Sequence, residues 1–187
     1  MASNIEIKAR SKDFANQKKL AEKISGGTPE LLIQEDIFFR VPQGRLKLRI
    51  LGPNQGELIA YSRPDPPVIK QSTYEIFRTT YPERLRIALS SALPVERTVR
   101  KRRSLYHIGQ SRMHFDEVEG LGEFIELEFV LEEDQPPTEG YAIVQHLMID
   151  LGIREEDLID VAYAELLNET RPTSDTAKAA TVKRGLS

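Results

Sequence analysis

The chain has 187 residues, of which 40% are hydrophobic, and a formal net charge of −3; these values are ordinary for a soluble chain of one domain that buries a core. The slightly acidic balance argues against a general nucleic-acid or membrane binder, and no apolar run is long enough to cross a bilayer. We expect no leader, because Met1 to Arg10 already alternates like a strand. The sequence holds no cysteine, which excludes disulfides, thiolate metal sites and cysteine catalysis. We therefore expect a cytoplasmic, single-domain protein.

The N-terminal half predicts one helix among several strands. Residues 4–10 alternate polar and apolar side chains, as a half-buried strand does. Helical spacing follows over residues 11–24 and stops at a pair of glycines. Proline- and glycine-rich turns then separate four segments typical of strands, which are Leu31–Val41, Arg45–Leu51, Glu57–Arg63 and Lys70–Phe77.

The second half predicts three more strands and three more helices. Pro82 favours the start of a helix over Glu83–Leu93. A hairpin follows, with strands Val95–His107 and Ser111–Val118, and then a last strand, Glu123–Leu131. Two helices are expected over Glu139–Leu151 and Glu155–Leu167. We expect one domain over residues 1–168 and a disordered tail over residues 169–187, where the chain becomes polar and small.

These elements predict an α+β fold. Most connections between the strands are too short for parallel crossovers, so the strands are expected to pair antiparallel. The simplest architecture is an antiparallel barrel of about eight strands with the helices packed outside it.

Several strands carry charged side chains two residues apart, which places both on the same face. Three strands carry pairs, which are Glu6 with Lys8, Lys47 with Arg49, and Glu126 with Glu128, and a fourth carries the set Arg112, His114 and Asp116. In one interpretation each charged face points to solvent. In the other, the helices cover the apolar faces and the charged faces line the interior. Periodicity does not decide for Lys101 and Arg103, because Arg100 and Arg102 make both faces of that strand basic.

A barrel interior lined by these charges would need a partner that compensates them, because buried unpaired charge is costly. A polyanion together with a divalent metal does this, since basic groups bind phosphate oxygens and clustered carboxylates bind Mg²⁺ or Mn²⁺. The patterning therefore favours a phosphate ligand.

The chain resembles the CYTH superfamily, the triphosphate tunnel metalloenzymes, which include class IV adenylyl cyclases and thiamine triphosphatases. The resemblance covers roughly residues 3–168, and its Gly120-Leu121-Gly122 stretch is similar to the class IV cyclase branch. The motifs that carry it, in the family's order, are Asn4-Ile5-Glu6-Ile7-Lys8, Asp36-Ile37-Phe38-Phe39, Leu46-Lys47-Leu48-Arg49, Tyr61-Ser62-Arg63, Lys101-Arg102-Arg103, Arg112-Met113-His114-Phe115-Asp116, Glu126-Leu127-Glu128 and Tyr163-Ala164-Glu165-Leu166-Leu167.

The resemblance implies roles for two sets of residues. Glu6, Glu126 and Glu128 would be catalytic and would bind Mg²⁺ or Mn²⁺, with Asp116 as a further metal ligand. The triphosphate would be bound by Lys8, Lys47, Arg49, Arg63, Lys101, Arg103 and Arg112. His114 is left between two interpretations, a contact to phosphate or carboxylate and a histidine satisfied within the barrel.

One position departs from the family signature Glu-x-Glu-x-Lys. Its first carboxylate is Asn4 in this chain, so the metal cluster has one negative charge fewer. An amide oxygen attracts Mg²⁺ less than a carboxylate does, which predicts that a second metal binds weakly. A neutral strand residue without a role is the alternative.

The leading hypothesis is metal-dependent hydrolysis of a small-molecule triphosphate, such as ATP, thiamine triphosphate or tripolyphosphate. The alternatives are a class IV adenylyl cyclase, which converts ATP to cyclic AMP and pyrophosphate, and a non-catalytic phosphate-binding module. No nucleic-acid or membrane partner is expected. The sequence leaves the oligomeric state open, with a homodimer as one option.

Overall fold

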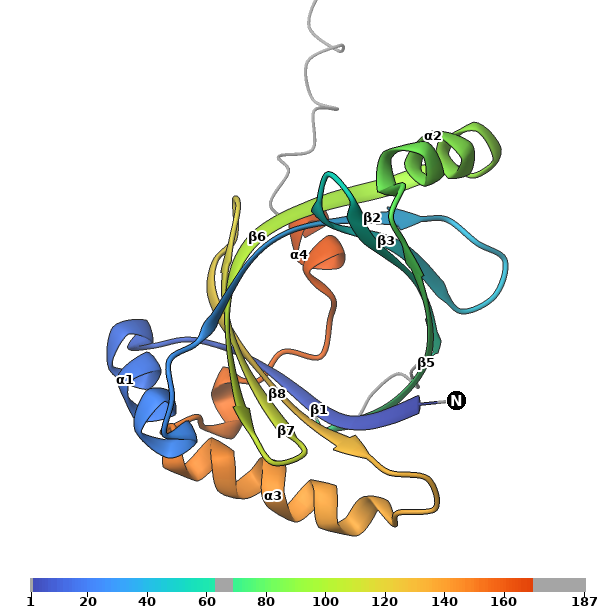
Figure 1. Ribbon diagram of the computed structural model, residues 1–187. Coiled ribbons are helices and arrows are strands. Elements are labelled where there is room, and N and C mark those ends of the chain that lie inside the picture. The colour runs from blue at the N-terminus through green and yellow to red at the C-terminus, as the bar shows by residue number, and fades with distance from the viewer. Residues whose placement is uncertain (1, 63–68, 170–187) are drawn as a thin grey trace, which may run out of the picture.

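The computed structural model describes residues 2–62 and 69–169, which form eight strands and four α-helices (Figure 1). The strands are β1 (Ala2–Arg10), β2 (Glu30–Phe39), β3 (Arg45–Gly52), β4 (Gln55–Ser62), β5 (Lys70–Thr79), β6 (Val95–Ile108), β7 (Ser111–Val118) and β8 (Gly122–Leu131). The helices are α1 (Phe14–Ser25), α2 (Pro82–Ala92), α3 (Pro137–Asp150) and α4 (Tyr163–Glu169), with a 3₁₀ turn at Glu155–Asp157.

The strands close into an antiparallel barrel in the order β1-β5-β4-β3-β2-β6-β7-β8. Neighbours in this order are joined mostly by hairpins, and β1 closes the ring by pairing with both β5 and β8. The predicted α+β fold, an eight-stranded antiparallel barrel, is confirmed. Because the barrel is closed, every strand has one face toward a common interior.

The apolar faces of the strands point outward and are covered by helices. The helix α3 packs on β1 and β8, α1 packs on β6 and β7, and α2 packs on β3 and β4. Ile5 on β1 and Leu127 on β8 are completely buried in the cluster under α3, whereas Leu48 on β3 is buried in the cluster under α2. The charged faces of the same strands therefore line the interior, as the second of the two interpretations predicts.

The predicted helix Glu155–Leu167 is wrong over its first half. The 3₁₀ turn ends at Asp157, Leu158 pairs with Ala9 of β1, and the amide of Ile159 donates to the carbonyl of Lys8. Because β5 pairs with β1 only as far as Glu6, the rest of that β1 edge is open to this segment. The helix begins at Tyr163, where the side chain of Glu165 accepts from the amide of Ala162, as in a capping box.

The last helix, α4, does not pack on the outer wall. Viewed along the barrel, it lies within the ring of strands (Figure 1), and Ala162 and Tyr163 line the interior. Arg45 at the start of β3 forms an ion pair of 2.6 Å with Glu165. The segment from Leu158 through α4 therefore covers one end of the barrel, which we call the α4 end.

Two further expectations concern membrane-spanning helices and the C-terminal tail. No helix among residues 2–62 and 69–169 is long and apolar enough to cross a membrane. The tail expected over residues 169–187 falls outside the described chain except for Glu169, which is the last residue of α4.

Gly140 provides a test of the packing between α3 and the barrel. A Cβ atom at this position would lie 2.8 Å from Cγ1 of Ile5 and 2.9 Å from Cδ1 of Phe129. We predict that Gly140→Ala lowers the free energy of unfolding by about 1–3 kcal/mol, because overpacking outweighs the gain in helix propensity. Urea unfolding measures this change. Gly27→Ala is the control, since nothing lies within 4 Å of its Cβ position; equal stability of the two variants would contradict the packing.

Candidate functional site

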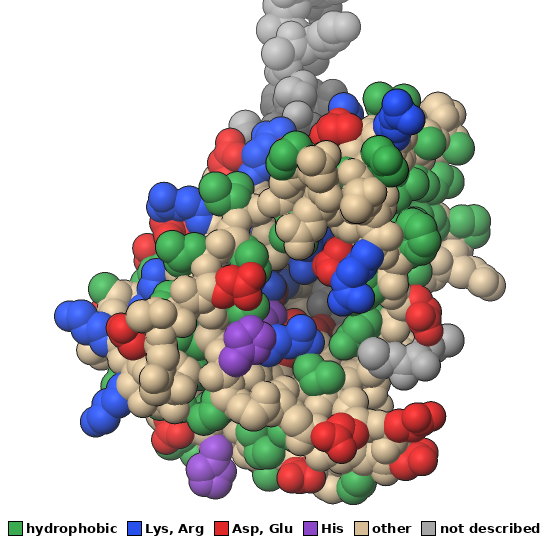
Figure 2. All heavy atoms as spheres, viewed as in Figure 1, with side chains coloured by type: hydrophobic (Ala, Val, Ile, Leu, Met, Phe, Trp, Pro, Cys, Tyr) green, Lys and Arg blue, Asp and Glu red, His purple; other side chains and the backbone are tan. Residues whose placement is uncertain are grey.

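The barrel encloses a cavity of about 360 Å³, which opens in the hollow surrounded by charged side chains in Figure 2. Each of the eight strands contributes at least two side chains to its lining, and β7 contributes Arg112 and His114. Most residues expected from the sequence to form the site meet there: Glu6, Lys8, Lys47, Arg49, Lys101, Arg103, Arg112, Glu126 and Glu128. Arg63 lies outside the described residues. Asp116 is fully buried behind the lining.

The strand pairing brings three carboxylates of the cavity close together. On β1 and β8, Glu6 lies opposite Glu128 in the register, and Lys8 lies opposite Glu126. Glu6, Glu126 and Glu128 thus cluster on these two strands, whereas the other carboxylates of the lining, Glu30, Asp36 and Glu57, come from β2 and β4. Two pairs of cations come from elsewhere in the ring, Lys47 and Arg49 from β3 and Lys101 and Arg103 from β6.

Arg100 and Arg102 do not belong to this set. Both side chains are mostly exposed on the outside of β6, where they pair with Glu35 and Glu117. Lys101 and Arg103 point inward and are each 5% exposed. The structure thus settles the orientation that periodicity leaves open.

Asp36 on β2 holds one pair of cations. Arg49 donates to it through Nε at 2.8 Å and through a terminal nitrogen at 2.9 Å, and Lys47 donates at 3.2 Å. Although burial opposes ionisation, the two cations hold the pKa of Asp36 well below its usual value. The sequence analysis assigns no role to Asp36. Its position on the polar face of the strand, two residues from Gln34, is the feature that could have placed it in the site.

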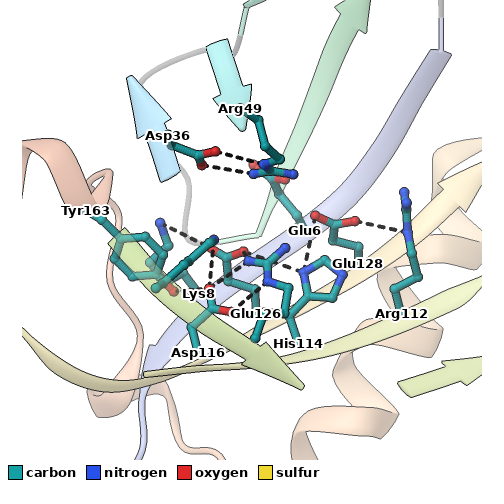
Figure 3. A network of polar contacts seen from close by, with 12 residues as sticks. Glu6, Lys8, Asp36, Arg49, Arg112, His114, Asp116, Glu126, Glu128 and Tyr163 are labelled. Carbon is teal, nitrogen blue, oxygen red and sulfur yellow. Dashed lines mark hydrogen bonds and ion pairs between the residues drawn. The ribbon is translucent and has the colours of Figure 1, made fainter. Parts of the chain in front are cut away.

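Asp116 on β7 holds the other pair of cations (Figure 3). Arg103 donates to both of its oxygens at 2.6 Å, and Lys101 donates at 2.9 Å. Against the effect of burial, these cations lower the pKa of Asp116 to about 2. Burial and the neighbouring Arg103 lower the pKa of Lys101 to about 8. Asp116, expected as a metal ligand, is thus engaged by cations in this structure.

Tyr163 of α4 reaches the same carboxylate from the α4 end. Its hydroxyl donates to Asp116 at 3.1 Å, and Nζ of Lys8 lies 3.8 Å from the centre of its ring. The ring therefore contributes a cation–π contact of about 0.5–2 kcal/mol to the position of Lys8. Tyr163 belongs to one of the motifs that carry the family resemblance, but the sequence predicts no role for it in the site.

The acidic cluster places like charges side by side. Glu6 accepts from Ser72 at 2.9 Å and from the Asn4 amide at 3.3 Å. Burial and the nearby carboxylates of Glu128 and Glu126 raise the pKa of Glu6. A cation bound between these carboxylates would relieve their repulsion.

His114 lies between the two glutamates of β8. Its Nδ1 is 3.5 Å from Oε2 of Glu126 and 3.7 Å from Oε1 of Glu128. Burial and the Arg103 guanidinium lower the pKa of His114, which favours the neutral imidazole at neutral pH. A donor atom from each of these three residues lies within 4.8 Å of the others, a spacing that fits one metal ion. The donor set of carboxylates and a neutral imidazole suits a divalent cation.

Cations also contact the carboxylate oxygens of this cluster. Lys8 lies 3.2 Å from Oε1 of Glu126, and Arg103 lies 2.5 Å from Oε2. Arg112 lies 3.2 Å from Oε2 of Glu128. In the protein alone, cations and carboxylates of the cavity therefore neutralise one another (Figure 3).

Comparison with known proteins identifies the family. The CYTH domain matches residues 2–163, and the chain belongs to the CYTH family. A search of functionally curated proteins finds no significant match.

Solved structures share the fold at low sequence identity. The PH1012 protein of Pyrococcus horikoshii is 24% identical with a TM-score of 0.76, over 87% of this chain and 98% of the other. A putative adenylate cyclase of Vibrio parahaemolyticus is 20% identical with a TM-score of 0.69, over 88% and 97%. HpAC1 of Hippeastrum, a putative adenylyl cyclase described as having a dominant triphosphatase activity, is 14% identical with a TM-score of 0.64, over 93% and 98%.

The network around Asp116 generates a stability prediction. Asp116→Asn leaves Lys101 and Arg103 buried without their shared anion, so we expect the free energy of unfolding to fall by about 3–5 kcal/mol in urea titrations. Glu117→Gln is the matched control one residue away, because it breaks only the exposed pair with Arg102 and should cost less than about 1 kcal/mol. Similar losses for the two variants would show that the interior network is not a stabilising unit.

Proposed function

We propose that this CYTH-domain protein is a metal-dependent triphosphatase, which binds a triphosphate inside the barrel and hydrolyses a phosphoanhydride bond with Mg²⁺ or Mn²⁺. The observation that carries the proposal is that one cavity is lined both by a cluster of three carboxylates and by several cations. Glu6, Glu126 and Glu128 lie together on β1 and β8, and two pairs of cations face the cavity from β3 and β6. The carboxylate cluster suits a metal, and the cations suit the phosphate chain.

The cations are held in place before any ligand arrives. Asp36 orients Lys47 and Arg49, and Asp116 orients Lys101 and Arg103. Such preorganisation lowers the entropy that binding costs. Each charge-assisted hydrogen bond to a phosphate oxygen would contribute about 1.5–3 kcal/mol. We assign phosphate binding to these four, to Lys8 and Arg112, and, on the resemblance alone, to Arg63.

We assign metal binding to Glu6, Glu126 and Glu128. All three carboxylates face the cavity, and the like charges around Glu6 make it a position where a cation is favourable. When bound, the ion supplies Lewis-acid neutralisation of charge on the phosphate oxygens. The same glutamates would be the catalytic residues, because they hold the reacting phosphate through the ion.

For hydrolysis, the protein mainly has to position the phosphate chain and the attacking water and to stabilise the charge of the transition state. Water attacks a phosphorus atom, the bridging P–O bond breaks, and the shortened phosphate chain leaves with the electron pair of that bond. One proton of the water stays on the new orthophosphate, and the other is released to solvent. Arg103 and Lys101 on one strand and Arg49 on another would hold the chain extended across the cavity. Guanidinium groups also offset the negative charge that develops on the leaving oxygen.

Apolar side chains in the same cavity favour a substrate with an organic part. Leu32, Leu51, Ile76 and Leu105 line it together with the charged residues. In the strand register they lie toward the end opposite α4, since Leu105 pairs with Glu30 at the start of β2. An organic group attached to the phosphate chain would be bound there by its apolar surface.

An adenylyl cyclase is the second candidate, because a structural neighbour from Vibrio parahaemolyticus carries that putative activity. The same cavity would then hold ATP while its ribose 3′-hydroxyl attacks the α-phosphate and pyrophosphate leaves. The triphosphatase activity described for HpAC1 supports hydrolysis as the first candidate. A binding module without turnover remains the third.

A product assay separates these candidates. The purified protein is incubated with ATP, thiamine triphosphate or tripolyphosphate, each with Mg²⁺ or Mn²⁺, and the products are resolved by chromatography. We predict release of orthophosphate. Cyclic AMP with pyrophosphate would assign the cyclase instead, and a rise in melting temperature with tripolyphosphate but no product would assign the binding module.

Two variants should distinguish residues needed for hydrolysis from residues needed for binding of the phosphate chain. Glu128→Gln is predicted to abolish hydrolysis while tripolyphosphate binding partly survives, because the cations remain. Arg103→Ala is predicted to weaken tripolyphosphate binding roughly 10- to 100-fold in calorimetry, the equivalent of one charge-assisted bond.

Arg102→Ala is the matched control for Arg103→Ala. It removes the same charge from the next position on β6, but from the outer face, and should leave binding within about twofold. Equal losses in the two arginine variants would refute the interior phosphate site. Full activity in Glu128→Gln would refute the metal assignment.

A further inference from the structure

We propose that His114 is a direct ligand of the metal, through Nδ1 and together with Glu126 and Glu128, and that the site selects Mn²⁺ over Mg²⁺. The inference rests on the proposed function only in that the same site binds the ion. It adds a nitrogen donor to a set of carboxylates and thereby ranks Mn²⁺ above Mg²⁺ at this site.

The first observation is that His114 points an unpartnered nitrogen into the acidic cluster. Its side chain is 4% exposed, and Nδ1 has no hydrogen-bond partner. A buried polar nitrogen left in this way costs about 1–3 kcal/mol unless something satisfies it. A metal ion between the imidazole and the two glutamates would satisfy it.

The second observation is the orientation of the two glutamates. Glu128 presents Oε1 toward the imidazole and Oε2 toward Arg112. Glu126 presents Oε2 toward the imidazole and Oε1 toward Lys8. Each carboxylate thus has one oxygen fixed by a cation that lines the cavity and the other oxygen near His114. An ion can be shared by the three residues without displacing Lys8 or Arg112.

Arg103 is the cation that must give up a contact before the metal can bind all three residues. It lies 2.5 Å from the Oε2 atom of Glu126 that faces His114. A bound phosphate chain would give Arg103 a competing partner and release that oxygen. We therefore expect tripolyphosphate and Mn²⁺ to strengthen each other's binding, and by linkage the effect is equal in both directions.

The acidic cluster has a neutral neighbour on β1. Asn4, two residues from Glu6, carries an amide, whose Oδ1 is also buried without a hydrogen-bond partner. β1 thus contributes the carboxylate of Glu6 to the cluster, while β7 offers an imidazole on the other side of β8. Mg²⁺ prefers oxygen ligands, whereas Mn²⁺ accepts imidazole as well as carboxylate.

Pulsed electron paramagnetic resonance of Mn²⁺ tests the ligation directly. The spectra are recorded on the full chain with less than one equivalent of Mn²⁺, with and without tripolyphosphate. We expect a ¹⁴N coupling from imidazole in the wild type and its loss in His114→Gln. The sequence has three histidines, and the exposed His107 and His146 provide the controls His107→Gln and His146→Gln, which should keep the coupling.

Competition between ions tests the selectivity. We expect the ratio of Mn²⁺ to Mg²⁺ affinity to fall at least about tenfold in His114→Gln and to shift further toward Mg²⁺ in His114→Glu, which supplies an oxygen ligand. Melting temperatures establish that both variants are folded. A wild type that binds Mn²⁺ without ¹⁴N coupling, or an unchanged affinity ratio in folded His114→Gln, would overturn the proposal.

These outcomes are distinct from a failure of the proposed function. A ¹⁴N coupling in a protein that releases no product would support the ligation by His114 and count against the triphosphatase. Hydrolysis without the coupling would do the reverse.

Discussion

The structure depends on a constraint of electrostatics, which is that charges taken out of water must be compensated. Helices cover the apolar outer faces of the strands, so the charged faces have only the interior available. Asp36 and Asp116, which are 3% and 0% exposed, each compensate two cations. The protein is thereby stable with its cations already aimed at one cavity. A bound polyanion would meet cations that are already in position, and a divalent metal would offset part of the negative charge that it brings.

Much of the fold is predictable because its strands alternate clearly. The patterns of β1, β3 and β8 predict that each strand has one apolar and one charged face, but they leave open which of the two faces lines the interior. The segment after α3 is not predictable in this way, because Leu158 and Ile159 suit a helix as well as a strand. Their conformation depends on the open edge of β1 beyond Glu6, which is a property of the assembled barrel.

The site is predictable in its residue types but not in its pairings. Arg102 and Arg103 are indistinguishable in sequence, and only the pairing of β6 with β7 gives Arg103 the buried partner Asp116. His114 gains its neighbours from the register between β7 and β8, where it lies opposite Glu126. Tyr163 reaches the site because α4 turns into the end of the barrel. Each of these relations is long-range, so local periodicity carries no signal for it.

A crystal structure with tripolyphosphate and Mn²⁺ tests the central claim most directly, which is that the interior cations bind a phosphate chain inside the barrel. The account predicts the chain inside the barrel, with Arg49 and Arg103 in contact with phosphate oxygens and with Mn²⁺ on the glutamates of β8. A phosphate chain bound only outside the barrel, with the cavity side chains still paired as they are in the protein alone, would contradict it.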